Sequence, residues 1–404
     1  MVKQEIRYEE EMNMKVVIIP SGFKESLSAE EVGKAIANGV NKVEGKHEVT
    51  TIPMVDGGEG FVDTIIKLKE GKKIATQVMG PIGKPIPSYF GVFKESGVKT
   101  AVIEMAAIAG LRHVPRNMRN PLNTTTFGVG ETIIKALDYG VERILIGCGD
   151  SGTSDGGVGM AQAVGVKFLN KEGEPIFING GGEINRIHGV DMRYMDPRVH
   201  LVDIDVAVNW MNILCGSKGV ARVFGPQKGA SIEDVEQLSS NLEHLARLIK
   251  SFKGDDLSLI NGGGASGGLG AGLHGFLNAK LHPRFEIIMK YIKISDAIIN
   301  ADLVITAEGC IDYQTPNGKI PSEVARIAKS HNKPVIAFAG TIGLNAKINY
   351  QSGIDAFTSI IPEPTTLENS ISDAKDWLEN CSENAFRHIM IGINLGNQMV
   401  AKEM

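Results

Sequence analysis

The sequence predicts an α/β protein of two domains, one built on a parallel sheet and a second, with a mixed sheet, inserted into it. Short β-branched apolar runs alternate with loops and amphipathic helix patterns, which is the order that a parallel sheet requires. Turn-forming residues cluster at 80–100 and 170–200, a pattern typical of hairpins. The length of 404 residues accommodates two or three domains of roughly 150 residues.

The first strand–loop–helix unit lies near the N-terminus. Residues 15–19 (KVVII) predict a strand that ends at Pro20, and Ser28 precedes a helical pattern with two acidic residues in its first turn. The pattern recurs at 144–146, 302–306 and 334–338, and a last strand near 356–361 precedes a long amphipathic helix after residue 365. We therefore expect one parallel sheet of the flavodoxin-like type.

The inserted hairpins set the expected domain boundaries. Residues 14–78 and 290–400 are predicted to form one discontinuous domain, and residues 79–289 the inserted α/β domain. Residues 1–13 form a polar, acid-rich extension that is unlike a secretory signal, and Met14 is an alternative start.

Composition excludes several classes of protein. The net charge of −5, with acids and bases interspersed, argues against binding to nucleic acid or to an anionic membrane surface. Apolar runs stay far below the roughly 20 residues of a membrane helix. We expect a cytoplasmic protein whose partners are small molecules, and a homodimer stays open. The four cysteines lie far apart in the chain, which predicts reduced, packed thiols.

Glycine is in excess, with 48 residues against about 28 expected from average usage. The excess lies in four clusters, at 56–60 (DGGEG), 147–159 (GCGDSGTSDGGVG), 180–182 and 262–275 (GGGASGGLGAGLHG). Glycine-rich turns that open helices let backbone N–H groups approach a phosphate. The alternative for any one cluster is a tight turn or close packing.

Known phosphate and hydrolase signatures do not account for these clusters. The chain has no G-x-x-x-x-G-K-[ST], no H-E-x-x-H and no G-x-S-x-G. Residues 270–275 match G-x-G-x-x-G, but they do not follow an apolar strand, so a dinucleotide fold is disfavoured.

Acids, hydroxyls and lysines accompany the glycines at the ends of the predicted strands, where a parallel sheet presents its active-site edge. They are Lys24, Asp56, Glu59, Ser151, Thr153, Asp155, Glu308, Asp312 and Lys319. Phosphoryl transfer needs cations beside the phosphates, carboxylates for Mg²⁺ and an acceptor for the attacking hydroxyl. Taken singly, each carboxylate also fits a helix cap or a solvated charge, and each lysine an ordinary surface residue.

At these residues the sequence resembles the type I glycerate kinases, the glycerate 2-kinase family, from Met14 to the last helix. The segments MVDGGEGFVDT, NPLNTTTFGVGE, DSGTSDGGVGM, VFGPQKGA and ASGGLGAGL occur in the family's order and spacing. The resemblance implies two α/β domains with a cleft between them. It also implies an ATP-dependent kinase that phosphorylates D-glycerate, an organic acid, at its 2-hydroxyl.

Polar residues of the motifs depart from the family pattern. Ser21-Gly22 replaces Asp-Ser, Val208-Asn209-Trp210 replaces Cys-Asp-Val, and Cys310 and Tyr313 replace Arg and Gly. An arginine at 310 would pair a substrate carboxylate in a bidentate geometry that a cysteine does not supply. Besides a glycerate kinase, the sequence therefore leaves open a related kinase with a shifted substrate and a weakly catalytic, ligand-binding paralogue.

The mechanistic hypothesis assigns phosphate binding to the loops 149–157 and 262–270, and charge compensation to Lys24 or Lys319. Mg²⁺ is expected on Asp155 or on the pair Glu308 and Asp312. Asp312 or Asp56 is expected to orient the attacking hydroxyl. The substrate- and nucleotide-binding candidates are Ser26, Gly57, Gly58, Glu59, Ser151, Thr153, Gly156, Asn209, Asn212, Gly267, Gly268 and Gly270.

Overall fold

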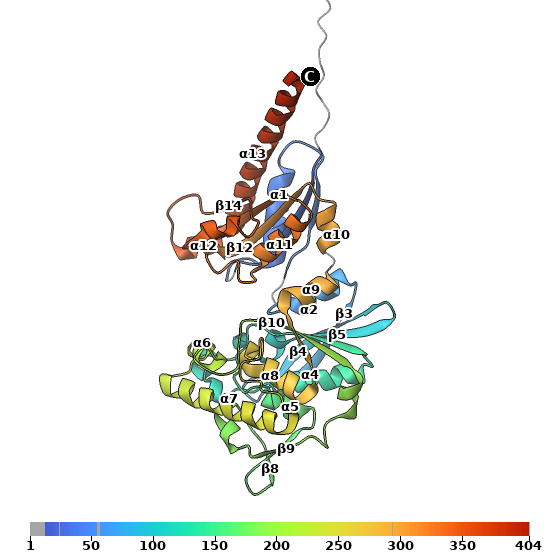
Figure 1. The fold of residues 1–404 in the computed structure, drawn as a ribbon, viewed down its shortest axis with the longest axis vertical. Coiled ribbons are helices and arrows are strands. Elements are labelled where there is room, and N and C mark those ends of the chain that lie inside the picture. The colour runs from blue at the N-terminus through green and yellow to red at the C-terminus, as the bar shows by residue number, and fades with distance from the viewer. Residues whose placement is uncertain (1–12, 24, 55–56, 293, 404) are drawn as a thin grey trace, which may run out of the picture. The chain divides into compact units, whose positions relative to one another are not determined.

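The computed structural model describes residues 13–23, 25–54, 57–292 and 294–403, which fall into two compact units (Figure 1). One unit lies within residues 1–55 and 293–404, and the other within 56–292. The first boundary is at residue 55 rather than near 78, because β3 (Lys72–Met79) pairs along its whole length with β4 (Pro85–Glu95) of the second unit.

The discontinuous unit contains a five-stranded sheet in the order β14-β13-β12-β1-β2, with all neighbours parallel. Its elements are β1 (Lys15–Pro20), α1 (Ala29–Asn41), β2 (Glu48–Thr51), α10 (Ile294–Ile299), β12 (Leu303–Ile311), α11 (Ile320–Ser330), β13 (Val335–Ile342), β14 (Ala356–Ser359), α12 (Leu367–Ser372) and α13 (Ala374–Glu403). Renumbered along the sheet, this is the 2-1-3-4-5 order of flavodoxin-like folds. The predicted parallel sheet is confirmed.

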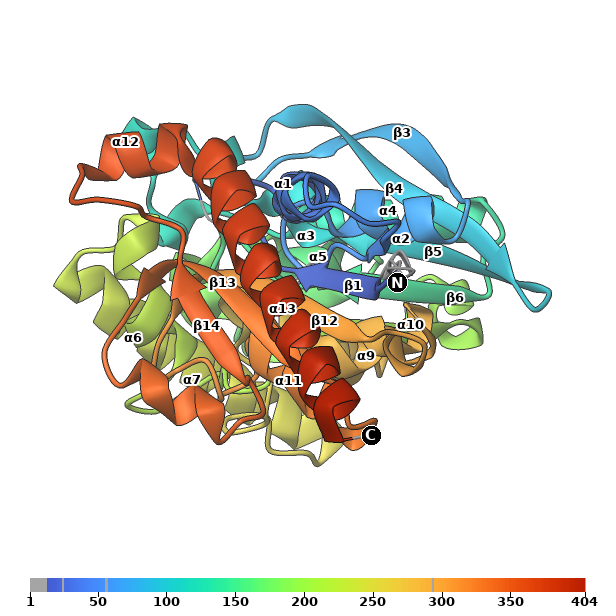
Figure 2. The same ribbon diagram turned by 90° about the horizontal axis from the view of Figure 1, so that it is seen from above.

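Helices α1 and α13 cover one face of this sheet, as Figure 2 shows. Alternate residues of β1, Val16 and Ile18, join the core beneath these two helices, whereas Ile19 points to the other face. Ser28 caps α1 through a capping box with Glu31, as its position in the sequence predicts. The close approach of α1 and α13 requires Gly39, because a Cβ there would lie 2.0 Å from Ser382 Oγ.

The continuous unit is built on a six-stranded sheet in the order β11-β10-β6-β5-β4-β3. Strands β5, β6, β10 and β11 are parallel, and β3 and β4 are antiparallel. Its further elements are α2 (Phe61–Leu68), β5 (Val98–Glu104), α3 (Met105–Ala109), α4 (Phe127–Asp138), β6 (Arg143–Gly147), α5 (Val158–Ala163), β7 (Lys167–Leu169), β8 (Pro175–Ile176), β9 (Gly189–Asp191), β10 (Asp203–Val208), α6 (Val220–Phe224), α7 (Ile232–Lys253), α8 (Ala265–Leu277), β11 (Lys280–Pro283) and α9 (Arg284–Tyr291). The sheet is mixed, as the hairpin signals predict.

The hairpin signals differ in outcome. Strands β4 and β5 form a hairpin whose two-residue turn, Ser96 and Gly97, has both φ angles positive, as a tight hairpin requires. Segment 170–200 supplies β8 and β9, which pair with β7 in a separate small antiparallel sheet. Among the described helices, none is long and apolar enough to cross a bilayer.

Candidate active site

Three of the four glycine clusters converge at the carboxyl ends of β6 and β10 in the continuous unit. A Cβ at Gly149 would lie 2.6 Å from the Cα of Gly58, and a Cβ at Gly267 only 1.9 Å from the carbonyl oxygen of Thr153. Side chains at these positions would push the loops apart, so the glycines are needed for close backbone approach. The structure therefore brings Gly57, Gly58, Ser151, Thr153 and the 262–268 loop together.

The first turn of α8 has an unusual, non-helical backbone. Ser266, Gly267 and Gly268 all have positive φ, and the Gly267 carbonyl accepts a hydrogen bond of 3.0 Å from the N–H of Gly156. Such left-handed turns at the start of a helix form the concave backbone surfaces that bind anions. Gly270, further along α8, packs closely against the backbone of Gly262. A Cβ added at Gly270 would lie 2.3 Å from the Gly262 carbonyl oxygen.

Asp155 is buried beneath these loops and organises them. One carboxylate oxygen accepts hydrogen bonds from the N–H and hydroxyl of Thr126 and from the N–H of Gly159, and the other accepts from the N–H of Gly157. Burial raises the pKa of Asp155, against the lowering effect of these four donors. The residue is 1% exposed, and all four of these donors come from the surrounding backbone and from Thr126. That it binds Mg²⁺ or acts in catalysis stays a prediction.

Lys228 lies behind the same loops, and the sequence analysis did not single it out. Its side chain is 2% exposed, and Nζ donates to Ser151 Oγ at 2.8 Å and to the carbonyl of Thr153 at 2.6 Å. Burial lowers the pKa of Lys228 to about 7, although the charge of Asp155 acts to raise it. Lys228 belongs to the segment VFGPQKGA, which occurs in the family's order and spacing. A single lysine in a loop, however, is usually a surface residue.

A second cluster of charges lies beside the 57–60 loop. The Glu59 carboxylate pairs with Arg112, and its backbone N–H donates to Asp150 at 3.1 Å. Glu104, at the end of β5, is fully buried and accepts a hydrogen bond of 3.1 Å from the N–H of Val62. Burial raises the pKa of Glu104 to about 7. Arg112 and Glu104 were both missed, since neither carries a glycine-loop signature.

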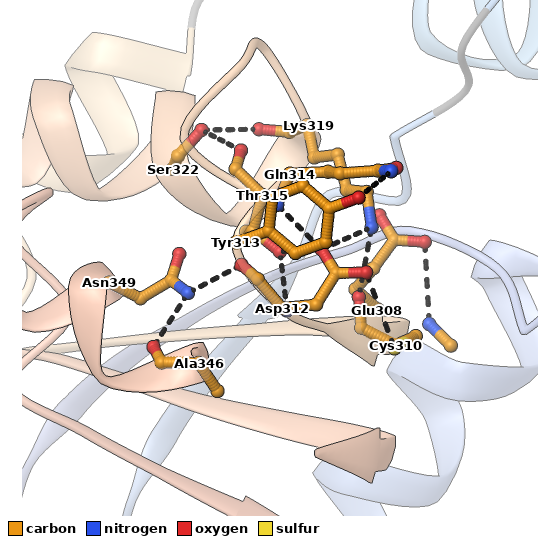
Figure 3. Close-up of polar contacts among 11 residues, drawn as sticks. Glu308, Cys310, Asp312, Tyr313, Gln314, Thr315, Lys319, Ser322, Ala346 and Asn349 are labelled. Atoms are coloured by element: carbon orange, nitrogen blue, oxygen red, sulfur yellow. Dashed lines mark hydrogen bonds and ion pairs between the residues drawn. The ribbon is translucent and has the colours of Figure 1, made fainter. Parts of the chain in front are cut away.

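The discontinuous unit carries its own polar cluster, in the turn between β12 and α11 (Figure 3). Lys319 lies at the N-cap of α11, and its Nζ donates to Asp312 Oδ1 at 3.3 Å and to the Cys310 carbonyl at 3.2 Å. Asn349 donates to the backbone carbonyl of Asp312 at 2.9 Å, which holds the turn in place. Glu308 lies on β12 beside this turn.

The Asp312 carboxylate stays ionised. Burial alone would raise its pKa, but the N–H of Gln314, at 2.8 Å from Oδ1, and the Lys319 ammonium together lower it. Oδ2 has a weaker neighbour, the Cys310 thiol at 3.8 Å. The turn follows β12, which is next to β1 at the point where the strand order reverses, the usual ligand site of such sheets.

The remaining predicted site residues lie in different parts of the chain and make different contacts. Lys24 and Asp56 lie outside the described residues. Ser26 donates its hydroxyl to the Ile371 carbonyl at 2.9 Å, which is a structural contact. Asn209 caps its own turn by accepting from the N–H of Met211. The Asn212 carbonyl accepts from the N–H of Gly264, which ties the end of β10 to the glycine loop.

Within the part of the chain that the structure describes, no three His, Cys, Asp or Glu side chains gather into a group that could hold a metal ion. Mg²⁺, which keeps several waters and shares ligands with phosphates, needs only one or two carboxylates.

Comparison with known proteins agrees with this arrangement. Residues 16–390 match the model of the glycerate kinase family. The chain is 43% identical to a glycerate kinase of Halalkalibacterium halodurans over 91% of its own length and 96% of that protein. It is 40% identical to the glycerate 2-kinase of Escherichia coli, covering 94% of this chain and 99% of that one.

A solved structure gives the same result. The crystal structure of a protein assigned as glycerate kinase 2, from Salmonella typhimurium LT2, is 39% identical to this chain. It superimposes with a TM-score of 0.78 and covers 95% of this chain and 100% of that one. Family model, relatives and fold therefore agree, and the chain belongs to the glycerate kinase family, whose members are kinases.

Proposed function

We propose that this chain transfers the γ-phosphoryl group of ATP to the 2-hydroxyl of D-glycerate, giving 2-phosphoglycerate and ADP. The observation that carries the proposal is the pairing of Asp312 with Lys319 at the carboxyl end of β12, where a kinase needs an ionised acceptor beside a cation. The relatives named glycerate kinase and glycerate 2-kinase support this substrate.

The converging glycine loops are the proposed site of the ATP phosphates. They combine close backbone approach, left-handed residues at the start of α8 and a buried lysine, features that suit a polyanion. Gly156, Gly267 and Gly268 supply backbone groups to this surface, and the Ser151 hydroxyl lies at its edge.

Mg²⁺ is proposed to bind at Glu308 and Asp312, whose carboxylate oxygens are the hard ligands it prefers. When bound, it would draw charge from the transferred phosphoryl group and thereby lower the barrier to attack. Asp155 is not proposed as a ligand, because four donors already engage its two oxygens.

Asp312 is also the proposed acceptor for the hydrogen of the attacking hydroxyl, and Asp56 is the alternative. The Lys319 ammonium holds Asp312 in its ionised form, so the carboxylate accepts a hydrogen bond and orients the hydroxyl toward the phosphorus. Lys319 then offsets negative charge on the group in transfer.

A kinase of the same family with a shifted substrate is the second candidate. The observation that favours it is Cys310, whose thiol lies 3.8 Å from Asp312 where the family pattern has an arginine. A small thiol does not bind a substrate carboxylate in two-pronged fashion. A polyol that accepts the phosphoryl group and has no carboxylate would not need that arginine.

Release of ADP with a panel of acceptors separates the two candidates. We expect kcat/KM with ATP and Mg²⁺ to be highest for D-glycerate, lower for L-glycerate and lowest for glycerol. Preference for glycerol would transfer the proposal to the shifted-substrate kinase. Ligand binding without turnover on any acceptor would support the weakly catalytic paralogue.

A further inference from the structure

Lys228 is an ionisable side chain that is buried with no carboxylate in contact with its Nζ. The structure describes no ion pair for it, and its two hydrogen-bond acceptors are the Ser151 hydroxyl and the Thr153 carbonyl. Isolated buried ammonium groups are costly and are retained where their charge has a use. The fold alone therefore gives little reason for a lysine at this position.

The backbone around Lys228 holds it in place. Pro226–Lys228 forms one turn of 3-10 helix, and the Lys228 N–H donates to the Gly225 carbonyl at 3.0 Å. Gly229 follows with a φ of 95°, and a Cβ there would lie 2.2 Å from the carbonyl oxygen of Arg119. The ammonium is thus directed at the 151–153 loop by a turn with little freedom to move.

The hydrogen bond to Ser151 has a chemical consequence. A hydroxyl has one hydrogen to donate and lone pairs to accept with. Because the Lys228 ammonium occupies a lone pair of Oγ, the Ser151 hydrogen is directed away from the lysine. The positive charge also polarises the O–H bond, which makes Ser151 a stronger donor to an anion.

The segment that accepts hydrogen bonds from Lys228 carries further buried hydroxyls. The side-chain oxygens of Thr153 and Ser154 are buried without a hydrogen-bond partner among the described residues. The negative charge of Asp155, in contrast, is directed at Thr126 and the start of α5. The 151–154 segment therefore combines a buried lysine with hydroxyl donors, a combination that favours an anion.

We propose that Lys228 is a positioning residue for the nucleotide: it orients and polarises the Ser151 hydroxyl as a donor to the ATP phosphates and supplies buried positive charge behind their loop. The inference rests on the proposed kinase function for the identity of the anion. Lys228 itself is too deeply buried to contact the nucleotide, so its effect passes through Ser151 and through space.

Nucleotides of increasing charge test this role. Adenosine, ADP and ATP are titrated by calorimetry into the wild type and into Lys228→Met. Lys250→Met is the control, because Lys250 is an exposed lysine that pairs with the exposed Asp256. We expect Lys228→Met to weaken ATP binding about 10- to 100-fold, ADP binding less and adenosine binding not at all. The control should match the wild type for all three ligands.

A merely structural lysine would give a different pattern. Loss of loop shape would weaken all three ligands by similar factors, and an uninvolved lysine would weaken none. Either result would overturn the proposal. Thermal unfolding of each variant shows that the compared proteins are folded.

Ser151→Ala provides a second test that leaves the lysine in place, and it decides the matter if Lys228→Met does not fold. We expect the same gradation from adenosine to ATP, with a smaller loss than Lys228→Met. In the double variant, the loss of ATP-binding free energy should be smaller than the sum of the losses in the two single variants, because both substitutions act through the Ser151 hydroxyl. An unchanged ATP affinity in Ser151→Ala would contradict the proposal that Lys228 acts on the phosphates through the Ser151 hydroxyl.

The experiment also separates this inference from the proposed function. Graded nucleotide binding by a protein that phosphorylates no glycerate would sustain the role of Lys228 and refute the glycerate reaction. Turnover of glycerate with equal losses for all three ligands would do the reverse. A wild type with no measurable affinity for ATP would refute both.

Discussion

Burial distinguishes the roles of the acidic residues. Asp155 and Glu104 are shielded from solvent, and their oxygens accept hydrogen bonds from backbone N–H groups at the starts of helices α5 and α2. Asp312 is partly exposed, and one of its carboxylate oxygens forms an ion pair with Lys319. In the sequence all three are carboxylates near strand ends, so only the folded chain separates the loop-organising acids from the one suited to chemistry.

Because Asp155 and Asp312 are expected to have different roles, the same substitution should affect stability at one position and turnover at the other. Asp312→Asn should lower kcat about 10²- to 10⁴-fold with little change in unfolding temperature, because it removes the ionised acceptor. Asp155→Asn should lower the free energy of unfolding by about 1–3 kcal/mol, because an amide cannot accept all four hydrogen bonds. Steady-state kinetics and denaturant unfolding measure both. Equal turnover in Asp312→Asn and the wild type would remove Asp312 from the mechanism.

Glu104 gives stability a pH dependence. Its pKa is raised from 4.5 to about 7 by burial, so the folded state binds a proton that the unfolded state has released between these values. Its contribution is therefore full below pH 4.5 and is lost as the pH rises through 7. Relative to Glu104→Gln, the wild type should lose about 2 kcal/mol of unfolding free energy between pH 5 and 8. A pH-independent difference, measured by urea unfolding, would show that Glu104 is not protonated in the fold.

At the scale of elements, the glycine loops are shaped by how closely they approach one another. The 147–157 loop is in contact with the 57–58 loop on one side and the 262–268 loop on the other, and glycines lie at the contacts. Helical geometry in α8 begins only after three left-handed residues. These loops join strand ends to helix starts, so backbone geometry rather than side-chain chemistry explains most of the glycine excess here.

Gly267→Ala tests this close approach. The substitution combines a left-handed φ of 71° with a Cβ 1.9 Å from the Thr153 carbonyl oxygen, and we expect a loss of more than about 2 kcal/mol of stability together with weaker ATP binding. Gly254→Ala is the matched control, since its φ of 87° is similar and no atom lies within 4 Å of the added Cβ. It should cost about 1–2 kcal/mol and leave ATP affinity unchanged. Equal effects in the two variants would mean that conformation alone, and not proximity, requires glycine at 267.

Much of the element pattern could be predicted from the sequence. The β-branched runs at 15–19 and 144–146 are strands, and Ser28 caps its helix, because these signals are local. The pairing of β3 with β4 could not be predicted in this way, since it depends on a partner strand chosen by tertiary packing. Lys228 was missed for the same reason: its burial depends on distant loops that fold over it.

At the scale of the whole molecule, we propose that each unit supplies one of the two requirements of phosphoryl transfer. The continuous unit carries the surface suited to the nucleotide phosphates, and the discontinuous unit carries the acid and lysine suited to the acceptor. The departures from the family pattern at Cys310 and Tyr313 belong to the unit of the acceptor, which is where substrate preference would change.

The position of the new phosphate group decides whether the protein is a glycerate 2-kinase. Purified protein is incubated with ATP, Mg²⁺ and D-glycerate, and the product is resolved by phosphorus NMR. We expect 2-phosphoglycerate in amounts equal to the ADP formed. Formation of 3-phosphoglycerate, or of ADP without any phosphoglycerate, would contradict it.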